Sequence, residues 1–134
     1  MTKNYKILTS YVKDISSKIS GTENYIYLKD NIPKYSLGID INSLPLKNNM
    51  AEVNIRLTFD NKNEKDKKAY FEMTHTTVVR VEESAVNKNE LKKIFLSDVP
   101  TEVYPEIEKK FFEIVKSIGY PEIKAKMIKK HTLK

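Results

Sequence analysis

The chain contains no cysteine and no tryptophan, and only three of its 134 residues are glycine. Without cysteine it cannot form a disulfide, a thiol nucleophile or a thiolate metal site. Gly21, Gly38 and Gly119 are too far apart to build the glycine-rich loop that binds phosphate. No stretch approaches the roughly 18 apolar residues of a membrane-spanning helix, and the first residues lack the apolar core of a secretory signal. The sequence therefore predicts a cytoplasmic protein without membrane insertion.

Few residues could carry catalytic chemistry. The two histidines, His75 and His131, are far apart in sequence, and a metal ion needs several converging ligands. The acidic residues at 82–83 and at 106 and 108 stand among charged neighbours, whereas catalytic carboxylates need settings that shift their pKa. We therefore expect no enzyme activity, no metal and no cofactor.

The net charge of +6 is concentrated at the C-terminal end of the chain. Residues 124–134 carry five lysines and no acidic residue, so the rest of the chain is nearly balanced. The simplest interpretation is a solvated, frayed basic tail. The alternative is a site for nucleic acid or an acidic partner, since clustered lysines attract phosphate groups.

From residue 5 to residue 82, apolar and polar residues alternate, as in strands that are buried on one face. Turn-forming residues at 20–24, 42–49 and 60–68 divide this region into four strands. The residues expected to share the buried face are Tyr5, Ile7, Thr9, Tyr11, Ile15, Ile19, Tyr35, Leu37, Ile39, Ile41, Val53, Ile55, Leu57, Phe59, Phe71, Met73, His75, Thr77, Val79 and Val81. Clean alternation and short turns favour antiparallel pairing.

Helical spacing replaces this alternation after residue 86. The sequence predicts a short helix near 91–95, and Pro105 fits the first turn of a longer one. Gly119 and Pro121 end the longer helix. Its apolar stripe consists of Ile107, Phe111, Ile114, Val115 and Ile118. We therefore predict one α+β domain over 1–134, in which a long helix packs on one face of a four-stranded antiparallel sheet.

The second face of this sheet is also expected to carry apolar residues, at Leu8, Val12, Tyr70 and Val78. One helix cannot cover both faces, and the edge strands need partners or protection. Both features predict assembly into an oligomer, either a dimer or a tetramer.

Several short motifs resemble those of one bacterial family. The block at 11–16, Tyr-Val-Lys-Asp-Ile-Ser, is similar to the Tyr-x-Lys-Asp-(Leu or Ile)-Ser block that ends the first strand of SecB proteins. Tyr27 and Pro33 fit the spacing of the loop that follows in that family, and 71–74 resembles its fourth strand. The family's later proline and aromatic frame is matched by Pro100, Tyr104, Pro105, Tyr120 and Pro121. The resemblance to SecB spans about residues 5–123.

This resemblance implies a homo-oligomeric chaperone that binds unfolded preproteins through an apolar groove and keeps them competent for export. Acidic residues on the SecB sheet bind the motor ATPase SecA, and Asp14 and Glu72 fall at such positions. The second C-terminal helix of the family is expected to be short, replaced or absent, because few residues follow Pro121. The candidate groove residues are Ile26, Tyr27, Leu28, Ile32, Tyr35, Leu37, Ile123 and Met127.

Two other functions stay open from the sequence. A SecB-fold protein can be dedicated to one partner, as toxin–antitoxin chaperones of this family are. A basic nucleic-acid-binding domain would instead need exposed aromatic residues interleaved with basic ones. Most strand aromatics here fall on the face expected to be buried, which favours the chaperone.

Overall fold

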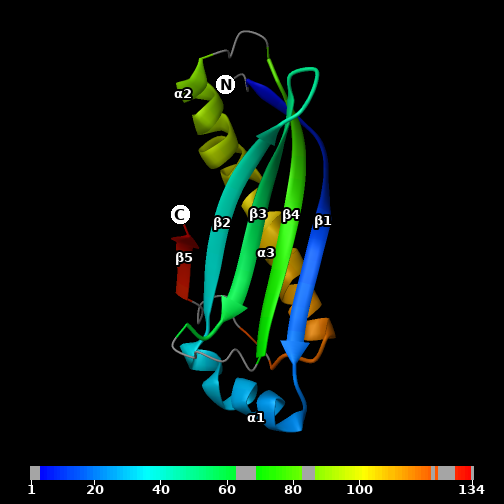
Figure 1. Cartoon of the computed structure of the whole chain (residues 1–134), viewed down its shortest axis with the longest axis vertical. Helices are drawn as coiled ribbons and strands as arrows, with labels where there is room; N and C mark the ends of the chain where they lie inside the picture. The colour runs from blue at the N-terminus through cyan, green and yellow to red at the C-terminus, as the bar shows by residue number, and fades with distance from the viewer. Residues whose placement is uncertain (1–3, 63–68, 83–86, 122, 124–128, 134) are drawn as a thin grey trace.

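A long, narrow sheet covered on one face by a helical column forms the body of the protein (Figure 1). The computed structural model describes residues 4–62, 69–82, 87–121, 123 and 129–133. The strands are β1 (Tyr5–Ile19), β2 (Ser36–Pro45), β3 (Met50–Asp60), β4 (Ala69–Val81) and β5 (Lys129–Leu133). Their order across the sheet is β1-β4-β3-β2-β5. The predicted four-stranded antiparallel sheet is confirmed, and β5 is an addition that pairs with β2 in parallel.

Two groups of helices accompany the sheet. Helix α1 (Thr22–Asn31) and the one-turn η1 (Ile32–Lys34) lie at one end of it (Figure 1). Helix α2 (Lys88–Lys93), the π-helical turn η2 (Ile94–Asp98) and α3 (Val99–Ser117) form the column. The predicted long helix is therefore confirmed, but it starts at Val99, so Pro105 lies inside it rather than in its first turn. The connection after the first strand, predicted as a loop, is helical.

Local chemistry explains where several elements begin and turn. The Asn87 side chain accepts a hydrogen bond from the Glu90 backbone N–H at 2.7 Å, which caps α2. The β2–β3 turn places Asn48 and Asn49 at φ of 63° and 61°. Asparagine tolerates this left-handed backbone better than most residues, so the pair suits a tight hairpin.

The core lies between α3 and the inner faces of β3 and β4. The ring of Phe111, on α3, lies 5.7 Å from that of Phe59 and 5.5 Å from that of Phe71 between centroids. Ile107 and Val115 complete the buried stripe of α3, as predicted. Ile118, also predicted in this stripe, is exposed because α3 ends one residue before it.

Two irregularities in β1 change which of its residues face the core. The pairing with β4 shifts between Ile7 and Thr9, and again between Val12 and Asp14. At each shift β1 has one residue more than β4, so the residues that follow it point to the opposite face of the sheet from the one that strict alternation gives them. As a result Tyr11 pairs with Thr76 on the outer face of the sheet, and Val12 packs against the core. The expectation that Thr9 and Tyr11 share the buried face with Tyr5, and Val12 the other, is wrong for this reason.

Candidate functional site

The segment from α1 to β2 carries most of the residues predicted to line a groove. The side chains of Leu28, Tyr35 and Leu37 are buried in the main core. The Tyr35 hydroxyl donates a hydrogen bond to the Ala69 carbonyl oxygen at 2.8 Å, which holds the ring inward. Because buried side chains cannot meet a partner at the surface, these three are removed from the candidate groove.

The other residues of this segment are more accessible. Ile26 is 51% exposed on α1. Tyr27 and Ile32 are half-buried against the core, and the Tyr27 hydroxyl accepts a hydrogen bond from Asn61 Nδ2 at 3.0 Å. These three residues stay as candidates at the α1 end of the sheet. Met127 lies outside the described residues.

A hollow of about 530 Å³ lies where α3 ends, and we call it the α3-end hollow. Tyr120 forms its floor, because its ring packs 6.2 Å from that of Phe59 and 6.4 Å from that of Phe71 between centroids. Burial raises the pKa of Tyr120 to about 12. Ile123, the remaining predicted groove residue, lines this hollow together with Phe112, Val115, Lys116 and Pro121.

A second apolar hollow, which we call the edge groove, runs along β2. It arises because α3 packs over β3 and β4, as Figure 1 shows, and leaves the inner face of β2 partly uncovered. Its volume is about 400 Å³, and Leu96 on its rim is 39% exposed. The groove is lined by Ile39, Ile41, Ile55, Leu96, Ser97, Pro100, Thr101, Tyr104 and Pro105.

Sequence reasoning missed the edge groove. Alternation placed Ile39 and Ile41 correctly on the inner face of β2, but it does not show which part of that face α3 covers. The sequence signal that could have revealed it is Leu96, which lies one residue after the predicted short helix. A large apolar residue there has no place in the stripe of the long helix.

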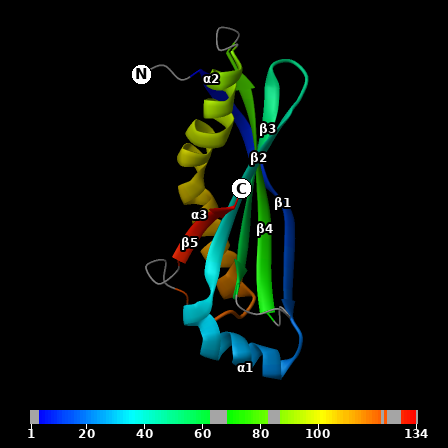
Figure 2. The same ribbon diagram turned by 60° about the vertical axis from the view of Figure 1, so that its left-hand side comes forward.

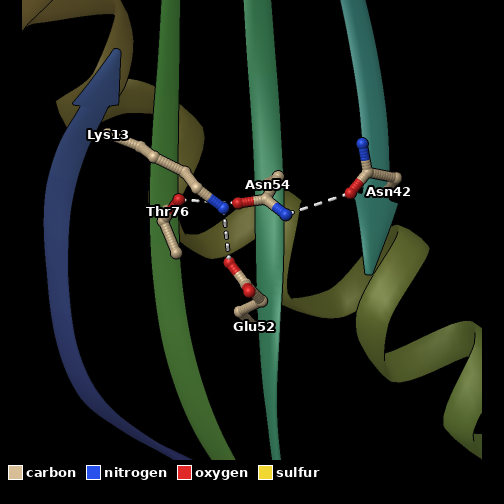
Figure 3. A network of polar contacts seen from close by, with 5 residues as sticks. All are labelled: Lys13, Asn42, Glu52, Asn54 and Thr76. Carbon is tan, nitrogen blue, oxygen red and sulfur yellow. Dashed lines mark hydrogen bonds and ion pairs between the residues drawn. The ribbon is translucent and has the colours of Figure 1, made fainter. Parts of the chain in front are cut away.

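The outer face of the sheet carries a polar network across four strands (Figure 3). Thr76 donates a hydrogen bond to Asn54 Oδ1 at 2.6 Å, and Asn54 Nδ2 donates one to Asn42 Oδ1 at 3.0 Å. Beside it, Lys13 Nζ lies 3.1 Å from Glu52 Oε2. Asn54 and Thr76 are buried although no described helix or strand covers this face, so neighbouring side chains shield the network.

Asp14 and Glu72, the predicted docking residues, both lie on this outer face. Asp14 pairs with Thr74, and Glu72 pairs with Ser16, so the two acids stand close together on adjacent strands. Asp14 also lines a shallow hollow of about 380 Å³ with Lys13 and Arg56. The surroundings of Asp14 are therefore of mixed charge.

Among the described residues, no histidine and carboxylate side chains gather in a group of three or more that could hold a metal ion. His75 is buried beneath α3, and its Nε2 lies 3.3 Å from Lys110 Nζ. In the part of the chain that the structure describes, no helix has the length and apolar character needed to cross a membrane.

Comparisons with known proteins agree on one family. The family model described as "Preprotein translocase subunit SecB" matches residues 1–133. A Pelagibacter ubique (strain HTCC1062) protein named "Putative protein-export protein SecB" is 47% identical over 124 residues, which cover 92% of this chain and 89% of that protein.

One solved structure supports the fold. It is a Mycobacterium tuberculosis SecB-like chaperone in complex with a ChAD peptide from the HigA1 antitoxin. The two chains superpose with a TM-score of 0.65 over 90% of this chain and 88% of the other, at 11% sequence identity.

Proposed function

This chain belongs to the SecB family of protein-export chaperones, and we propose that it is a holdase that binds unfolded preproteins and keeps them competent for export. The observation that carries this proposal is the edge groove, an open apolar surface beside a strand edge. A holdase needs such a surface and no catalytic group. We therefore propose that the chain is not an enzyme and needs no cofactor.

The groove can capture many sequences because apolar contacts are non-directional. Burial of apolar surface contributes about 25 cal/mol for each Å² removed from water. By this estimate, burial of two or three large apolar side chains of a short extended segment supplies enough free energy to hold a client in the groove. Low sequence specificity is what a general export chaperone requires.

We propose that the client contacts two groups of residues. The first lies in the edge groove, where Ile39, Ile41 and Leu96 are accessible. The second comprises the accessible part of the predicted groove, namely Ile26, Tyr27 and Ile32 at α1 and Ile123 in the α3-end hollow.

We further propose a cytoplasmic homo-oligomer, a dimer or tetramer, formed through the free edge of β1. In the described sheet β1 pairs only with β4, so its other edge has no partner. Leu8, Tyr11 and Ile15 on β1 are exposed. An unpaired edge with exposed apolar residues is stabilised when a second copy covers it. Light scattering coupled to size exclusion measures the oligomer directly.

SecA is proposed as a partner of the outer face through Asp14 and Glu72. The two acids lie on adjacent strands of one exposed face, which gives a basic partner a paired target. Reversing both charges should abolish binding to immobilised SecA without changing client capture. Retained binding would remove this face from the docking surface.

A role with one dedicated partner is the second candidate, because the Mycobacterium tuberculosis SecB-like chaperone was solved with a peptide of an antitoxin. Nucleic-acid binding is less well supported. Nζ of Lys130, in the basic tail, lies 2.6 Å from Oε2 of Glu108, so this positive charge is already paired within the chain.

The deciding experiment is the aggregation of guanidinium-unfolded citrate synthase on dilution, followed by light scattering at 50 mM and 500 mM salt. We expect suppression at both salt concentrations, because apolar capture does not depend on screened charges. Suppression only at low salt would indicate capture by the basic tail. No suppression would overturn general chaperoning and leave the dedicated partner.

A further inference from the structure

The C-terminal strand β5 is held in the sheet differently from the other strands. It pairs with β2 in parallel over Ser36–Asp40, whereas the other neighbouring strands are antiparallel. Parallel pairing is slightly less stable per residue, and β5 has only five residues. Of the strands in the described sheet, β5 therefore has the weakest backbone attachment.

Lys130 is the β5 residue whose side chain the structure describes, and its attachment is also modest. Lys130 Nζ donates a hydrogen bond to Glu108 Oε2 at 2.6 Å, and it lies 5.7 Å from the centroid of the Tyr104 ring. Both partners belong to α3. The ion pair is partly exposed to solvent, and such pairs contribute little to stability. The short parallel pairing and this exposed ion pair are the attachments that a competing segment would have to displace.

The position of β5 connects it to the edge groove. Figure 2 shows β5 beside β2 and close to α3. Its register ends where Leu133 pairs with Asp40, and within the described part of the chain the same edge of β2 continues unpaired from Ile41 to Pro45. Tyr104 contacts Lys130 and also lines the edge groove. The strand edge and the groove thus form one continuous surface.

We propose that β5 is an internal competitor of the client: it occupies the part of the β2 edge that an extended segment of an unfolded polypeptide takes when it binds. The inference rests on the holdase function proposed above. The client segment would add to β2 as a strand, with its backbone pairing with Ser36–Pro45 and its apolar side chains filling the edge groove. Main-chain hydrogen bonds supply affinity without reading sequence, which suits a chaperone with many clients.

Competition of this kind lowers the apparent affinity for clients in a predictable way. The observed dissociation constant is the intrinsic one divided by the fraction of molecules in which β5 has left the edge. Tightening β5 should therefore weaken capture, and loosening it should strengthen capture. A strand that only stabilises the fold would affect stability and leave affinity unchanged.

The test locks β5 in place. Because the chain has no cysteine, the double substitution Ser36→Cys and Lys129→Cys introduces the two thiols of one disulfide. These residues are register partners on neighbouring strands, whose spacing is compatible with a disulfide. The probe is fluorescein-labelled α-lactalbumin, reduced and carboxymethylated so that it stays unfolded and cannot exchange disulfides. Binding is measured by fluorescence anisotropy, and each single cysteine variant is the control.

We expect the oxidised double variant to bind the probe at least tenfold more weakly than its reduced form, with the single variants unaffected by oxidant. Equal binding by the oxidised and reduced forms would overturn the competition while leaving the holdase function intact. If the reduced and wild-type proteins both fail to bind, the proposed function fails and the inference with it. The two failures are therefore distinguishable.

A second variant loosens β5 instead. Lys130→Met removes the two described contacts of Lys130 with α3, and we expect the probe to bind about two- to fivefold more tightly. The matched control is Lys92→Met on α2, which removes one exposed positive charge elsewhere. Weaker binding by the Lys130 variant would mean that β5 forms part of the client site, and would overturn the proposal.

Discussion

Nε2 of the His75 ring lies 3.3 Å from the ammonium nitrogen of Lys110, beneath α3. Burial, and then the positive charge of Lys110, lower the pKa of His75 to about 4. A neutral ring accepts the hydrogen bond of the lysine, whereas a protonated ring has no acceptor and would face a second positive charge. His75, predicted from the sequence to lie on the buried face of the sheet, is therefore held neutral inside the fold.

This pairing predicts an acid-sensitive component of stability. The unfolded chain protonates His75 near pH 6.5 and the folded chain near pH 4, so the unfolded state binds more protons between these values. Stability should fall as the pH decreases through this window, by about 1–3 kcal/mol, and level off below it. Urea unfolding between pH 7 and pH 4 measures the loss. The variant His75→Gln should lack this component, and parallel pH profiles would contradict the assignment.

The packing of Phe111 predicts a large loss of stability when its side chain is shortened to alanine. Its ring contacts those of Phe59 and Phe71 and is fully buried, so Phe111→Ala removes contacts with both strands and leaves a cavity. The free energy of unfolding should fall by about 3–5 kcal/mol. The control is Ile118→Ala beyond the end of α3, where 45% exposure predicts a small effect. Comparable losses for the two variants would show that α3 does not pack as described.

The hydrogen bond between Thr76 and Asn54 predicts coupled effects on the outer face (Figure 3). Asn54→Ala leaves the buried Thr76 hydroxyl without this acceptor, and Thr76→Val leaves Asn54 Oδ1 without this donor. Each substitution should lower the free energy of unfolding by about 1–3 kcal/mol. The double variant should cost less than the sum, because neither member of the Thr76–Asn54 hydrogen bond is then left without the other. Strictly additive losses in urea unfolding would indicate that the two side chains are independent.

The edge groove predicts a loss of capture without a loss of fold. Leu96 is partly exposed on the rim, so Leu96→Ser should weaken binding of unfolded α-lactalbumin several-fold and leave the melting temperature nearly unchanged. The matched control is Leu46→Ser, since Leu46 is exposed to a similar degree in the β2–β3 turn, outside the groove. Equal effects of the two changes would remove Leu96 from the client site.

Two residues of helix α1 that lie close in sequence should respond differently to substitution by serine. Leu28 is fully buried, so Leu28→Ser should destabilise the protein by about 2–5 kcal/mol. Ile26 is half exposed, so Ile26→Ser should change stability little and reduce client capture. Thermal unfolding and anisotropy separate the two effects. Reduced capture in a Leu28 variant would then reflect loss of fold, and a stable Leu28→Ser protein would contradict the packing.

Strands β2 to β4 were predictable because their alternation is unbroken and their core residues share one face. β1 was predictable as a strand, but the faces of Thr9, Tyr11 and Val12 were not. The bulges that exchange them leave no mark in the composition of the segment. The C-terminal strand was missed because a lysine-rich segment shows neither alternation nor β-branched enrichment, and its pairing depends on the edge that β2 leaves free.

The candidate site was predictable only in part, for a related reason. Ile26, Leu28 and Ile32 look alike in sequence, yet the helical geometry of α1 and η1 turns Leu28 into the core and leaves Ile26 outside. The edge groove joins Ile39 and Ile41 to Leu96 and Tyr104, which are far apart along the chain. Only the crossing of α3 over the sheet brings these residues together.

The strand order β1-β4-β3-β2-β5 also has a consequence for synthesis on the ribosome. Strand β1 is made before its partner β4, which emerges only after β2 and β3, so β1 waits with Leu8, Tyr11 and Ile15 unpaired. Unpaired apolar strands are the segments most prone to aggregate during folding. The three central strands can form a meander in the meantime, and β1 then joins as the closing strand. A nascent chain of this chaperone family thus passes through the same exposed state that it is proposed to protect in others.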